Sequence, residues 1–582
     1  MSSERKMVEN PAKKLKSDLI LSDYVQSHIL QKQDELHQKY VASKPYQHGL
    51  FESLFYPEFI TKVREEIKKN SKVNFKESDL FRVYQSIDMA NLNETDHIGT
   101  LPTVLELRRV LYSDEWRSLM EKMCGLKPGT LTGKVDCACN CHATGCHLLC
   151  HDDVIGTRKI SYIIYLTDEG WTEEEGGALE LYDRMPQKDD EKGERLQSTS
   201  FAEPASIPSG TLVPHFNNMA FFQVEPGVSY HAVQEVLGDR PRLSLQGWYH
   251  AADIPDQIES ATLQQLKKEA QTQESYIPFA YPENSTTELS DEDCQYLSEY
   301  IHPTYLTKES LGNICKRFEE DSSVQLRNFF SEKLVSQLTN ARAQEEKDTT
   351  KKVGDTEYYS QGQSADWKLA GPAHKQRFLE YTGDPSQSVD GKQTAGGILA
   401  HLKTNVMCSI PFQRFLARIT SLGLPQGHLG HVRRFRKGLD YTVAHYGILT
   451  QMPVLDATVC FVDGDGKDLG ALQEDGNEDD EPDEADILWQ SGDCGGFECY
   501  IAADEGDDAA DEYNQEDDTE LLSVSASNNT LSLVYRDPGT MRFVKYVGSS
   551  APSSRWDISI EYQVPDDDDD EGEQDLQKDL EA

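Results

Sequence analysis

Residues 150–153 have the sequence Cys150-His151-Asp152-Asp153, and a second histidine, His231, follows further along the chain. In an extended strand, side chains alternate between two faces. We therefore expect His151 and Asp153 to point the same way without a turn between them, and Asp152 to point away. Two imidazoles and one carboxylate on one face of a metal leave about three coordination positions open, which suits non-haem Fe(II) sites that activate oxygen. The pattern predicts an iron site at His151, Asp153 and His231, although either carboxylate of the pair is able in principle to reach the metal.

Short apolar segments surround these residues and are separated by turn signals such as Gly176-Gly177. We expect Arg242 to begin a strand that places Ser244 on the same face. The expected strands are 160–166, 178–182, 219–224 and 242–248. Short strands with turns predict a barrel or jelly roll, in which His231 and Arg242 face one mouth.

The combined pattern of His151-x-Asp153, His231 and Arg242-x-Ser244 resembles the 2-oxoglutarate- and Fe(II)-dependent dioxygenases. The wider context is similar to the prolyl 3-hydroxylases that modify a ribosomal small-subunit protein. The segments that carry this likeness are 75–86, 148–153 and 176–182, and a weaker likeness extends through the C-terminal half. The resemblance implies a mainly β fold with flanking helices (α+β). The implied fold would consist of two tandem double-stranded β-helix (jelly-roll) domains, of which the second is degenerate.

The resemblance also implies which groups bind. Fe(II) would be held by the two histidines and Asp153, and the far carboxylate of 2-oxoglutarate by Arg242, whose planar guanidinium offers two parallel donors. Family similarity adds Tyr165 to that carboxylate site, with Ser244 as a weaker candidate. O2 would be the oxidant, and L-ascorbate would help by reducing the iron again. The implied products are succinate, CO2 and a hydroxylated proline in a small-subunit ribosomal protein, with an effect on translation.

Two alternatives remain open at this stage. The acidic runs of the sequence and the degenerate second half favour an interaction platform that regulates translation or transcription with little or no catalysis. The intact set of predicted ligands in the first half argues against it. A third interpretation keeps the chemistry but changes the target to a lysyl or N-methyl group.

The second half of the chain repeats features of the first. Residues 495–500 echo 176–182, residues 531–539 echo 219–227, and residues 555–560 echo the strand at Arg242, which indicates a duplicated domain. The counterpart of the His-x-Asp pair would be His445-Tyr446-Gly447, where glycine offers no ligand, and no histidine follows His445. We therefore predict a non-catalytic second domain, with Arg555 as a paired structural residue rather than a cosubstrate clamp.

The composition sets the predicted domain organisation. A chain of 582 residues is too long for one ordinary core. We expect amphipathic helices over 23–40, 59–69 and 101–123. The predicted divisions are a disordered polar tail (1–22), a catalytic domain (23–253), a linker (254–300), a second domain (301–564) with acidic loops (463–488 and 503–519), and a disordered acidic tail (565–582).

The net charge of -44 argues against nucleic acid as a direct partner and favours a basic protein. No apolar run reaches the about 20 residues needed to span a bilayer, and the N-terminus lacks the apolar core of a secretory signal. We expect the cytoplasm and nucleus, with residues 11–16 as a candidate import signal. The cysteines and histidines between Cys137 and His151 invite a zinc interpretation, but their spacing is tighter than usual at zinc sites, so free thiols are favoured.

Overall fold

The computed structural model describes most of the chain. The described residues are 19–185, 203–253, 275–282, 285–348, 350–355, 357–385, 388–389, 392–444, 452–464, 483–502 and 520–565. Most of the predicted tails and acidic loops, and residues 445–447, lie outside these ranges. The end of the first predicted acidic loop differs from expectation, because α15 (Glu484–Ser491) forms there and buries Trp489.

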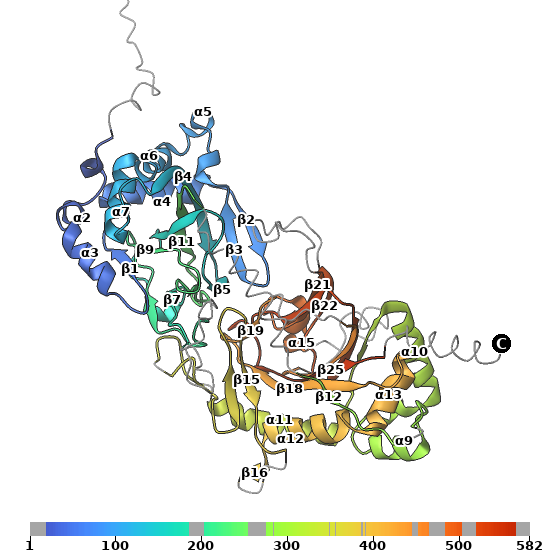
Figure 1. The fold of residues 1–582 in the computed structure, drawn as a ribbon. Coiled ribbons are helices and arrows are strands. Elements are labelled where there is room, and N and C mark those ends of the chain that lie inside the picture. Colours follow the sequence, from blue (N-terminus) through green and yellow to red (C-terminus); the bar gives the residue numbers. More distant parts are fainter. Residues whose placement is uncertain are drawn as a thin grey trace, which may run out of the picture.

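An antiparallel sheet of short strands forms the N-terminal unit (Figure 1). Its strands along the path are β1 (His48–Phe51), β9 (Met219–Gln223), β6 (Arg158–Tyr165), β11 (Arg242–Ala251), β4 (Leu131–His142), β3 (Phe81–Ser86), β5 (His147–His151), β10 (His231–Val233), β7 (Leu179–Leu181) and β8 (Gly210–Leu212). β2 (Val73–Glu77) pairs with β3. The sheet curls so that strands far apart in sequence share one interior, as the predicted jelly roll requires.

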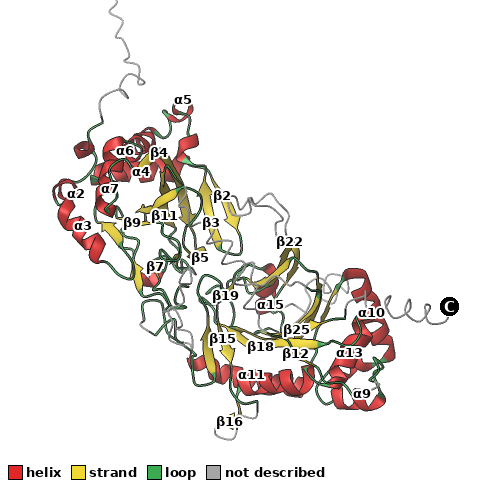
Figure 2. Cartoon of the chain, in the orientation of Figure 1, coloured by secondary structure: helices red, strands yellow, loops and turns green. Residues whose placement is uncertain are grey.

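Helices cover one side of this sheet (Figure 2). They are α2 (Ser27–Gln31), α3 (Gln33–Ala42), α4 (Pro57–Asn70), α5 (Glu94–His97), α6 (Pro102–Leu111) and α7 (Asp114–Cys124), with 3-10 turns at Leu21–Asp23, Met89–Asn91 and Glu173–Glu175. The helix expected over 101–123 is two helices, because the Ser113 hydroxyl accepts a hydrogen bond from the Trp116 amide and starts a new helix. The helix expected over 23–40 is likewise interrupted, at Lys32.

A second antiparallel sheet repeats the strand order of the first. Its path is β13 (Ser323–Leu326), β23 (Thr530–Arg536), β20 (Val454–Phe461), β25 (Arg555–Gln563), β18 (Gly427–Phe435), β15 (Gln376–Tyr381) and β14 (Trp367–Ala370), with β12 (Ile277–Pro278) on β18 and β19 (Tyr441–Thr442) on β15. A further sheet holds β22 (Glu520–Val524), β21 (Glu498–Ala502) and β24 (Thr540–Val544), and β16 (Ser388–Val389) pairs with β17 (Lys392–Gln393). The order β13-β23-β20-β25-β18-β15 matches β1-β9-β6-β11-β4-β3, which confirms the mainly β, duplicated fold.

The helices of the second unit are α9 (Asp291–Leu297), α10 (Lys308–Asp321), α11 (Glu332–Glu345), α12 (Ala395–His401), α13 (Ile410–Thr420) and α15, with 3-10 turns at Pro303–Leu306 and Glu346–Asp348 and a π-helical turn at Leu402–Met407. Part of the predicted 254–300 linker belongs to this unit. Ile277 pairs with His428 on β18, and Leu297 lies fully buried in the second core. The exact domain boundaries stay a prediction, because residues 254–274 lie outside the described ranges.

Equivalent asparagines show how closely the two units correspond. The Asn217 side chain donates to the Phe55 carbonyl (2.8 Å) and accepts from the Phe55 amide (2.9 Å). Asn529 makes the same two hydrogen bonds to Phe330, each 2.9 Å long. Both asparagines adopt a positive φ (63° and 48°), which asparagine tolerates better than most residues. The same asparagine turn, with the same two backbone hydrogen bonds, therefore occurs at the equivalent position in each sheet.

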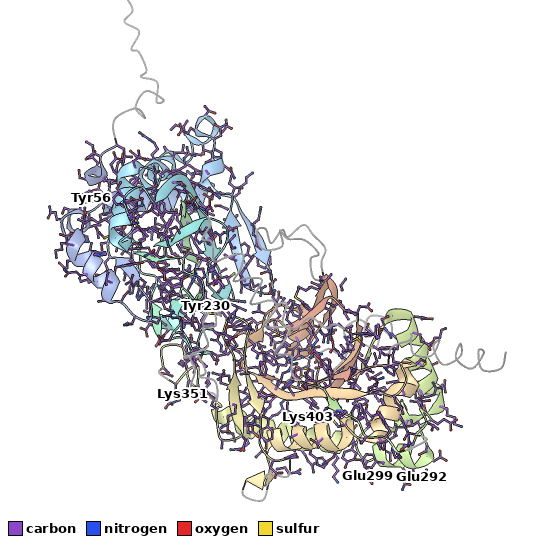
Figure 3. The ribbon with its side chains drawn as sticks, viewed as in Figure 1. Tyr56, Tyr230, Glu292, Glu299, Lys351 and Lys403 are labelled. Atoms are coloured by element: carbon purple, nitrogen blue, oxygen red, sulfur yellow. The ribbon has the colours of Figure 1, made fainter. Side chains whose placement is uncertain are left out.

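The two units meet beside β10. The buried carboxylate of Glu235 accepts hydrogen bonds from the Ser549 amide (2.9 Å) and hydroxyl (2.9 Å) and from the Tyr546 hydroxyl (3.2 Å). Tyr230 lies at this junction (Figure 3), and its ring is 5.2 Å from that of His374 in the second unit. The strand that begins at the predicted ligand His231 is thus flanked by contacts to the other unit. Among the described residues, no helix is long and apolar enough to cross a membrane.

Candidate metal centre

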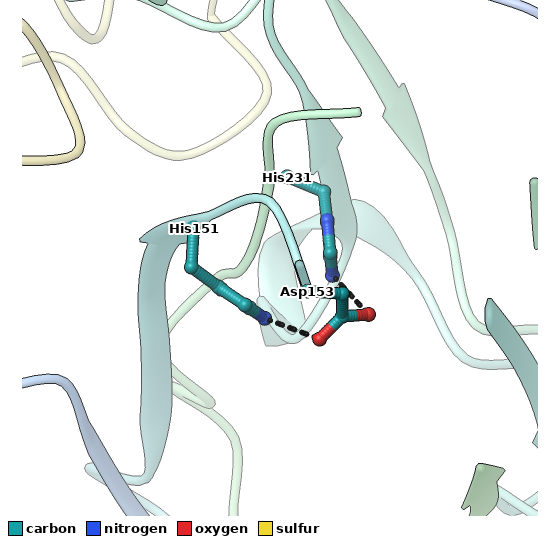
Figure 4. A group of neighbouring side chains, drawn as sticks. All are labelled: His151, Asp153 and His231. Atoms are coloured by element: carbon teal, nitrogen blue, oxygen red, sulfur yellow. Dashed lines mark ion pairs between the residues drawn. The ribbon is translucent and has the colours of Figure 1, made fainter. Parts of the chain in front are cut away.

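The structure brings His151, Asp153 and His231 together (Figure 4). His151 ends β5, His231 begins β10, and the two residues are partners in the register of these strands. Nε2 of His151 lies 3.2 Å from Oδ1 of Asp153, and Nε2 of His231 lies 3.4 Å from Oδ2. One potential ligand atom from each side chain lies within 4.8 Å of the others. Two imidazoles and a carboxylate therefore converge as a facial metal site requires.

The backbone at Asp153 differs from the expected strand. Asp153 has φ 62°, in the left-handed region, so a turn after His151 brings the two side chains together. The expectation that no turn is needed was wrong, although the predicted juxtaposition is present. Asp152 stabilises the turn: its carboxylate accepts from the Val154 amide (3.2 Å) and the Gly227 amide (3.4 Å). It stands apart from the cluster, as favoured, although it turns inward to these amides rather than outward.

Backbone carbonyls orient both imidazoles. Nδ1 of His151 lies 2.8 Å from the Leu149 carbonyl, and Nδ1 of His231 lies 2.8 Å from the Ser229 carbonyl. Because a carbonyl only accepts, each Nδ1 carries the proton and donates. Each Nε2 then presents its lone pair toward the cluster, which is the tautomer a metal ligand needs.

The Asp153 carboxylate is buried and held in place by an indole. Nε1 of Trp248 donates to Oδ2 of Asp153 over 2.9 Å, and the Arg158 guanidinium lies 3.5 Å from the centre of the Trp248 ring. Burial alone would raise the pKa of Asp153, but His231 and His151, which donate to it from Nε2 when they are protonated, hold that pKa well below its ordinary value. The group therefore stays a carboxylate, which is the form that ligates a metal.

A buried, partly unsatisfied guanidinium lies in the same interior. Nε of Arg242 donates to the Gly177 carbonyl (2.6 Å), and Nη1 donates weakly to the Ser244 hydroxyl (3.4 Å). Its Nη2, like the buried Tyr165 hydroxyl, has no hydrogen-bond partner among the described residues. The guanidinium carbon lies 5.2 Å from the centre of the Tyr165 ring. Burial raises the pKa of Tyr165 to about 12 although Arg242 lowers it, so the hydroxyl remains a donor at neutral pH.

These donors fit the far carboxylate of a small dicarboxylic acid. Burying a guanidinium without an anion is costly, because the charge loses its hydration and gains no compensating partner. Among the described residues no carboxylate forms an ion pair with Arg242, whereas two of its neighbours offer hydroxyl groups. The donor set therefore matches the predicted site for 2-oxoglutarate at Arg242, Tyr165 and Ser244.

The roles of three residues at this site were not predicted from the sequence. Gly177 has φ 70°, and a Cβ there would lie 2.8 Å from Cδ of Arg242, so glycine makes room for the guanidinium. His142 is the register partner of Arg242, and its buried Nδ1 has no hydrogen-bond partner among the described residues. Trp248 was assigned only to a strand. Predicting that the strands at 131–142 and 242–251 pair would have placed His142 opposite Arg242.

Among the described residues, none of the cysteines between Cys137 and Cys150 belongs to a group arranged to hold a metal. Cys137, Cys139, Cys146 and Cys150 are buried free thiols, and Cys141 is half-buried. Burial raises the pKa of the Cys137 thiol to about 12, so it stays protonated. Across the part of the chain that the structure describes, His151, Asp153 and His231 are the one group arranged to hold a metal.

The sequence relationships agree with this geometry. Residues 137–250 match the model of the 2OG-Fe(II) oxygenase superfamily, and residues 292–571 match that described as "Oxoglutarate and iron-dependent oxygenase degradation C-term". The prolyl 3,4-dihydroxylase OGFOD1 of Ostreococcus tauri is 36% identical over 535 residues, which cover 89% of this chain and 95% of the relative. The prolyl 3-hydroxylase OGFOD1 of Xenopus laevis is 28% identical over 523 residues, covering 87% and 84%. The crystal structure of a Pseudomonas putida prolyl-4-hydroxylase covers 38% of this chain and 100% of that one, with a TM-score of 0.25 and 16% identity.

The chain therefore belongs to the 2-oxoglutarate- and Fe(II)-dependent oxygenase superfamily. Within it, the chain is a 2-oxoglutarate-dependent prolyl dioxygenase that uses Fe(II), 2-oxoglutarate and O2. Its protein substrate contains the proline to be hydroxylated.

Proposed function

We propose that His151, Asp153 and His231 bind the Fe(II) of this prolyl dioxygenase. The two Nδ1 protons are committed to backbone carbonyls, so both Nε2 atoms are free to ligate. Trp248 fixes one carboxylate oxygen of Asp153 and thereby its orientation. Removing the carboxylate or one imidazole leaves too few ligands, and the expected result is loss of iron from a folded chain.

The far carboxylate of 2-oxoglutarate binds Arg242, with the Tyr165 hydroxyl as second donor and Ser244 as a weaker one. The observation that carries this assignment is the pair of unpartnered buried donors, Nη2 of Arg242 and the Tyr165 hydroxyl. When bound, iron and 2-oxoglutarate supply an O2-dependent oxidative decarboxylation to succinate and CO2 that delivers one oxygen atom to a C–H bond. The contribution of the chain is to orient the cosubstrate and to keep water out of a buried site.

The substrate we propose is a prolyl residue of a small-subunit ribosomal protein, hydroxylated at C3, so that the enzyme affects translation. Support comes from the resemblance of 75–86, 148–153 and 176–182 to hydroxylases of that class, and from relatives named prolyl 3-hydroxylase and prolyl 3,4-dihydroxylase. The net charge of -44 favours a basic protein partner. We further propose that L-ascorbate maintains ferrous iron and that the enzyme acts in the cytoplasm and nucleus.

Intact-mass analysis of the small-subunit ribosomal proteins tests this proposal. Cells that carry the wild-type chain should contain one protein heavier by one or two oxygen atoms than the same protein from cells that carry His231→Ala. Fragmentation should place the oxygen on C3 of a proline. Identical masses in the two cell lines, with an active purified enzyme, would reject the ribosomal substrate while leaving the prolyl dioxygenase activity intact.

A further inference from the structure

We propose that the Tyr46 hydroxyl donates a hydrogen bond to the carbonyl oxygen of the target prolyl residue, in a cavity at the mouth of the first barrel. The inference deepens the prolyl dioxygenase function and rests on it. It assigns a substrate-positioning role to a residue more than 100 positions before the metal cluster in the sequence.

Tyr46 reaches the barrel interior from the segment between α3 and β1. Its backbone carbonyl accepts hydrogen bonds from the Ser43 hydroxyl (3.2 Å) and from His48 Nδ1 (2.9 Å), which fix the turn. Its ring packs edge-on against Phe222, with 5.7 Å between centroids, and Phe222 packs edge-on against His231 at 4.7 Å. A single aromatic ring therefore separates Tyr46 from a residue of the metal cluster.

The two faces of β9 divide the neighbouring tyrosines. Phe222 points into the interior, where Tyr46 and Tyr165 belong to the same apolar cluster. Phe221 points to the opposite face, where the Tyr40 ring stacks on it at 5.8 Å. Tyr46 thus faces the reacting centre, whereas Tyr40 belongs to the outer core.

The Tyr46 hydroxyl is buried and has no hydrogen-bond partner among the described residues. A tyrosine hydroxyl that is buried usually finds a partner, because burying it unpaired costs free energy. Burial, together with Cys150 and Asp153, raises the pKa of Tyr46 well above its ordinary value. The hydroxyl therefore keeps its proton and is suited to an acceptor on a bound molecule.

A cavity of about 180 Å³ opens beside this ring. Tyr182 and Arg184 line it just after β7, and Glu225 and Val228 line it in the turn between β9 and β10. The strands β7 and β10 lie next to the metal cluster, because Leu181 on β7 is the register partner of the cluster residue His231 on β10. The cavity therefore lies at the metal end of the barrel. Arg184 and Glu225 are exposed at its rim, where they can meet polar groups of a flanking peptide.

The chemistry of a prolyl residue matches this arrangement. Proline has no backbone N–H, so its own backbone offers only an acceptor, the carbonyl oxygen. A site that orients proline by its backbone thus needs a donor. Arg242 and Tyr165 are assigned to the cosubstrate. Of the described residues that line the mouth cavity, Tyr46 then offers a buried hydroxyl without a hydrogen-bond partner.

The test uses the full chain loaded with Mn(II) and 2-oxoglutarate, which binds without turnover. The probe is the proline-centred peptide that the wild-type iron enzyme hydroxylates best from a peptide array. Tyr46→Phe should raise the Kd of this peptide about tenfold, the effect of one lost hydrogen bond, and leave the Kd of 2-oxoglutarate unchanged. With iron, the variant should form more succinate per hydroxylated peptide. The matched control, Tyr40→Phe, should change none of these quantities.

A thioamide in place of the prolyl carbonyl gives a second test that needs no variant to fold. This weaker acceptor should reduce binding to the wild-type chain but not reduce binding to Tyr46→Phe any further. Additive effects of the two changes would overturn the proposal. So would a loss of 2-oxoglutarate affinity with unchanged peptide binding, or no change in either. Failure of the wild-type enzyme to hydroxylate any proline in the array would overturn it together with the prolyl assignment, whereas the other outcomes leave that assignment intact.

Discussion

Arg242 and Arg555 occupy equivalent positions in the two sheets, but within the described residues only Arg555 is paired with carboxylates. Each guanidinium donates to the carbonyl of the second glycine of a Gly-Gly turn, Gly177 or Gly496. Two residues after Arg242 lies Ser244, whereas two residues after Arg555 lies Asp557, which accepts from Arg555 over 3.0 Å. Glu498 accepts a second hydrogen bond from Arg555 over 2.8 Å. The second barrel therefore supplies its own carboxylates where the first leaves donors for a bound anion.

Replacing Arg242 tests whether its guanidinium binds the cosubstrate. Arg242→Met should weaken 2-oxoglutarate binding by about 30- to 100-fold, because charge-assisted hydrogen bonds to the far carboxylate are worth about 2–3 kcal/mol. Isothermal titration of the Mn(II)-loaded chain measures this change. Arg242→Lys should recover only part of the affinity, because lysine lacks the planar fork. Equal affinity of the wild-type and Met variants would remove Arg242 from the cosubstrate site.

Replacing Arg555 should lower the stability of the chain and leave 2-oxoglutarate binding unchanged. Arg555→Met leaves Glu498 and Asp557 with less positive charge around them in the core, and breaking a buried pair costs about 3–5 kcal/mol. Urea denaturation should show this loss of stability. At a temperature where the variant is folded, its affinity for 2-oxoglutarate should equal that of the wild-type chain. A drop in affinity would indicate that the second barrel contributes to cosubstrate binding.

The indole that supports the metal cluster offers a third prediction. Trp248→Phe removes the hydrogen bond to Asp153, and loss of such a supporting contact should lower Fe(II) affinity about 10- to 100-fold. Competition with a chelator measures the affinity. Trp367→Phe is the matched control, because this buried indole donates to Glu345 in the second unit. It should leave iron binding unchanged, and equal effects of the two variants would contradict the role given to Trp248.

Acid should destabilise the chain in part through His147. Burial lowers the pKa of His147 to about 3, and its ring packs at 4.3 Å against Tyr546 of the second unit. In the unfolded chain, His147 binds a proton near its ordinary pKa of about 6.5. Its contribution to the free energy of unfolding is therefore complete above that pH and is lost progressively as the pH falls toward about 3. Between pH 7 and 5 the wild-type chain should lose about 2 kcal/mol more than His147→Phe. Parallel urea titrations at the two pH values measure this difference, and equal losses would show that His147 does not titrate as a buried group.

Short alternating strands and turn residues predicted the barrel. The His-x-Asp pattern and the distant His231 predicted the three side chains that the structure brings together. The β-branched run at 160–166 corresponds to β6, and the Gly176-Gly177 turn directly precedes the segment that contains β7. The pairing of β5 with β10 brings His151 and His231 together although they lie far apart in sequence. The echo of 176–182 in 495–500 indicated the duplicated domain. Periodicity failed at Asp153, because a left-handed residue in a turn has no repeating pattern.

Features that depend on tertiary packing lay beyond the sequence. Tyr46 precedes β1 in a segment without periodicity, and only the packing of Phe222 shows that it faces the interior. The contacts of Glu235 with Ser549 join residues more than 300 positions apart. The break between α6 and α7 was visible in principle, because Ser113 followed by Asp114 and Glu115 is a helix-start signal.

The most direct test of the account is an anaerobic titration of the full chain with Fe(II), followed by 2-oxoglutarate. Absorption from charge transfer between iron and the bound keto acid reports whether both occupy one site. The account predicts one iron per chain and the appearance of this band in the wild-type protein, with loss of iron in His231→Ala and loss of the band alone in Arg242→Met. Stoichiometric iron and an unchanged band in His231→Ala would contradict it.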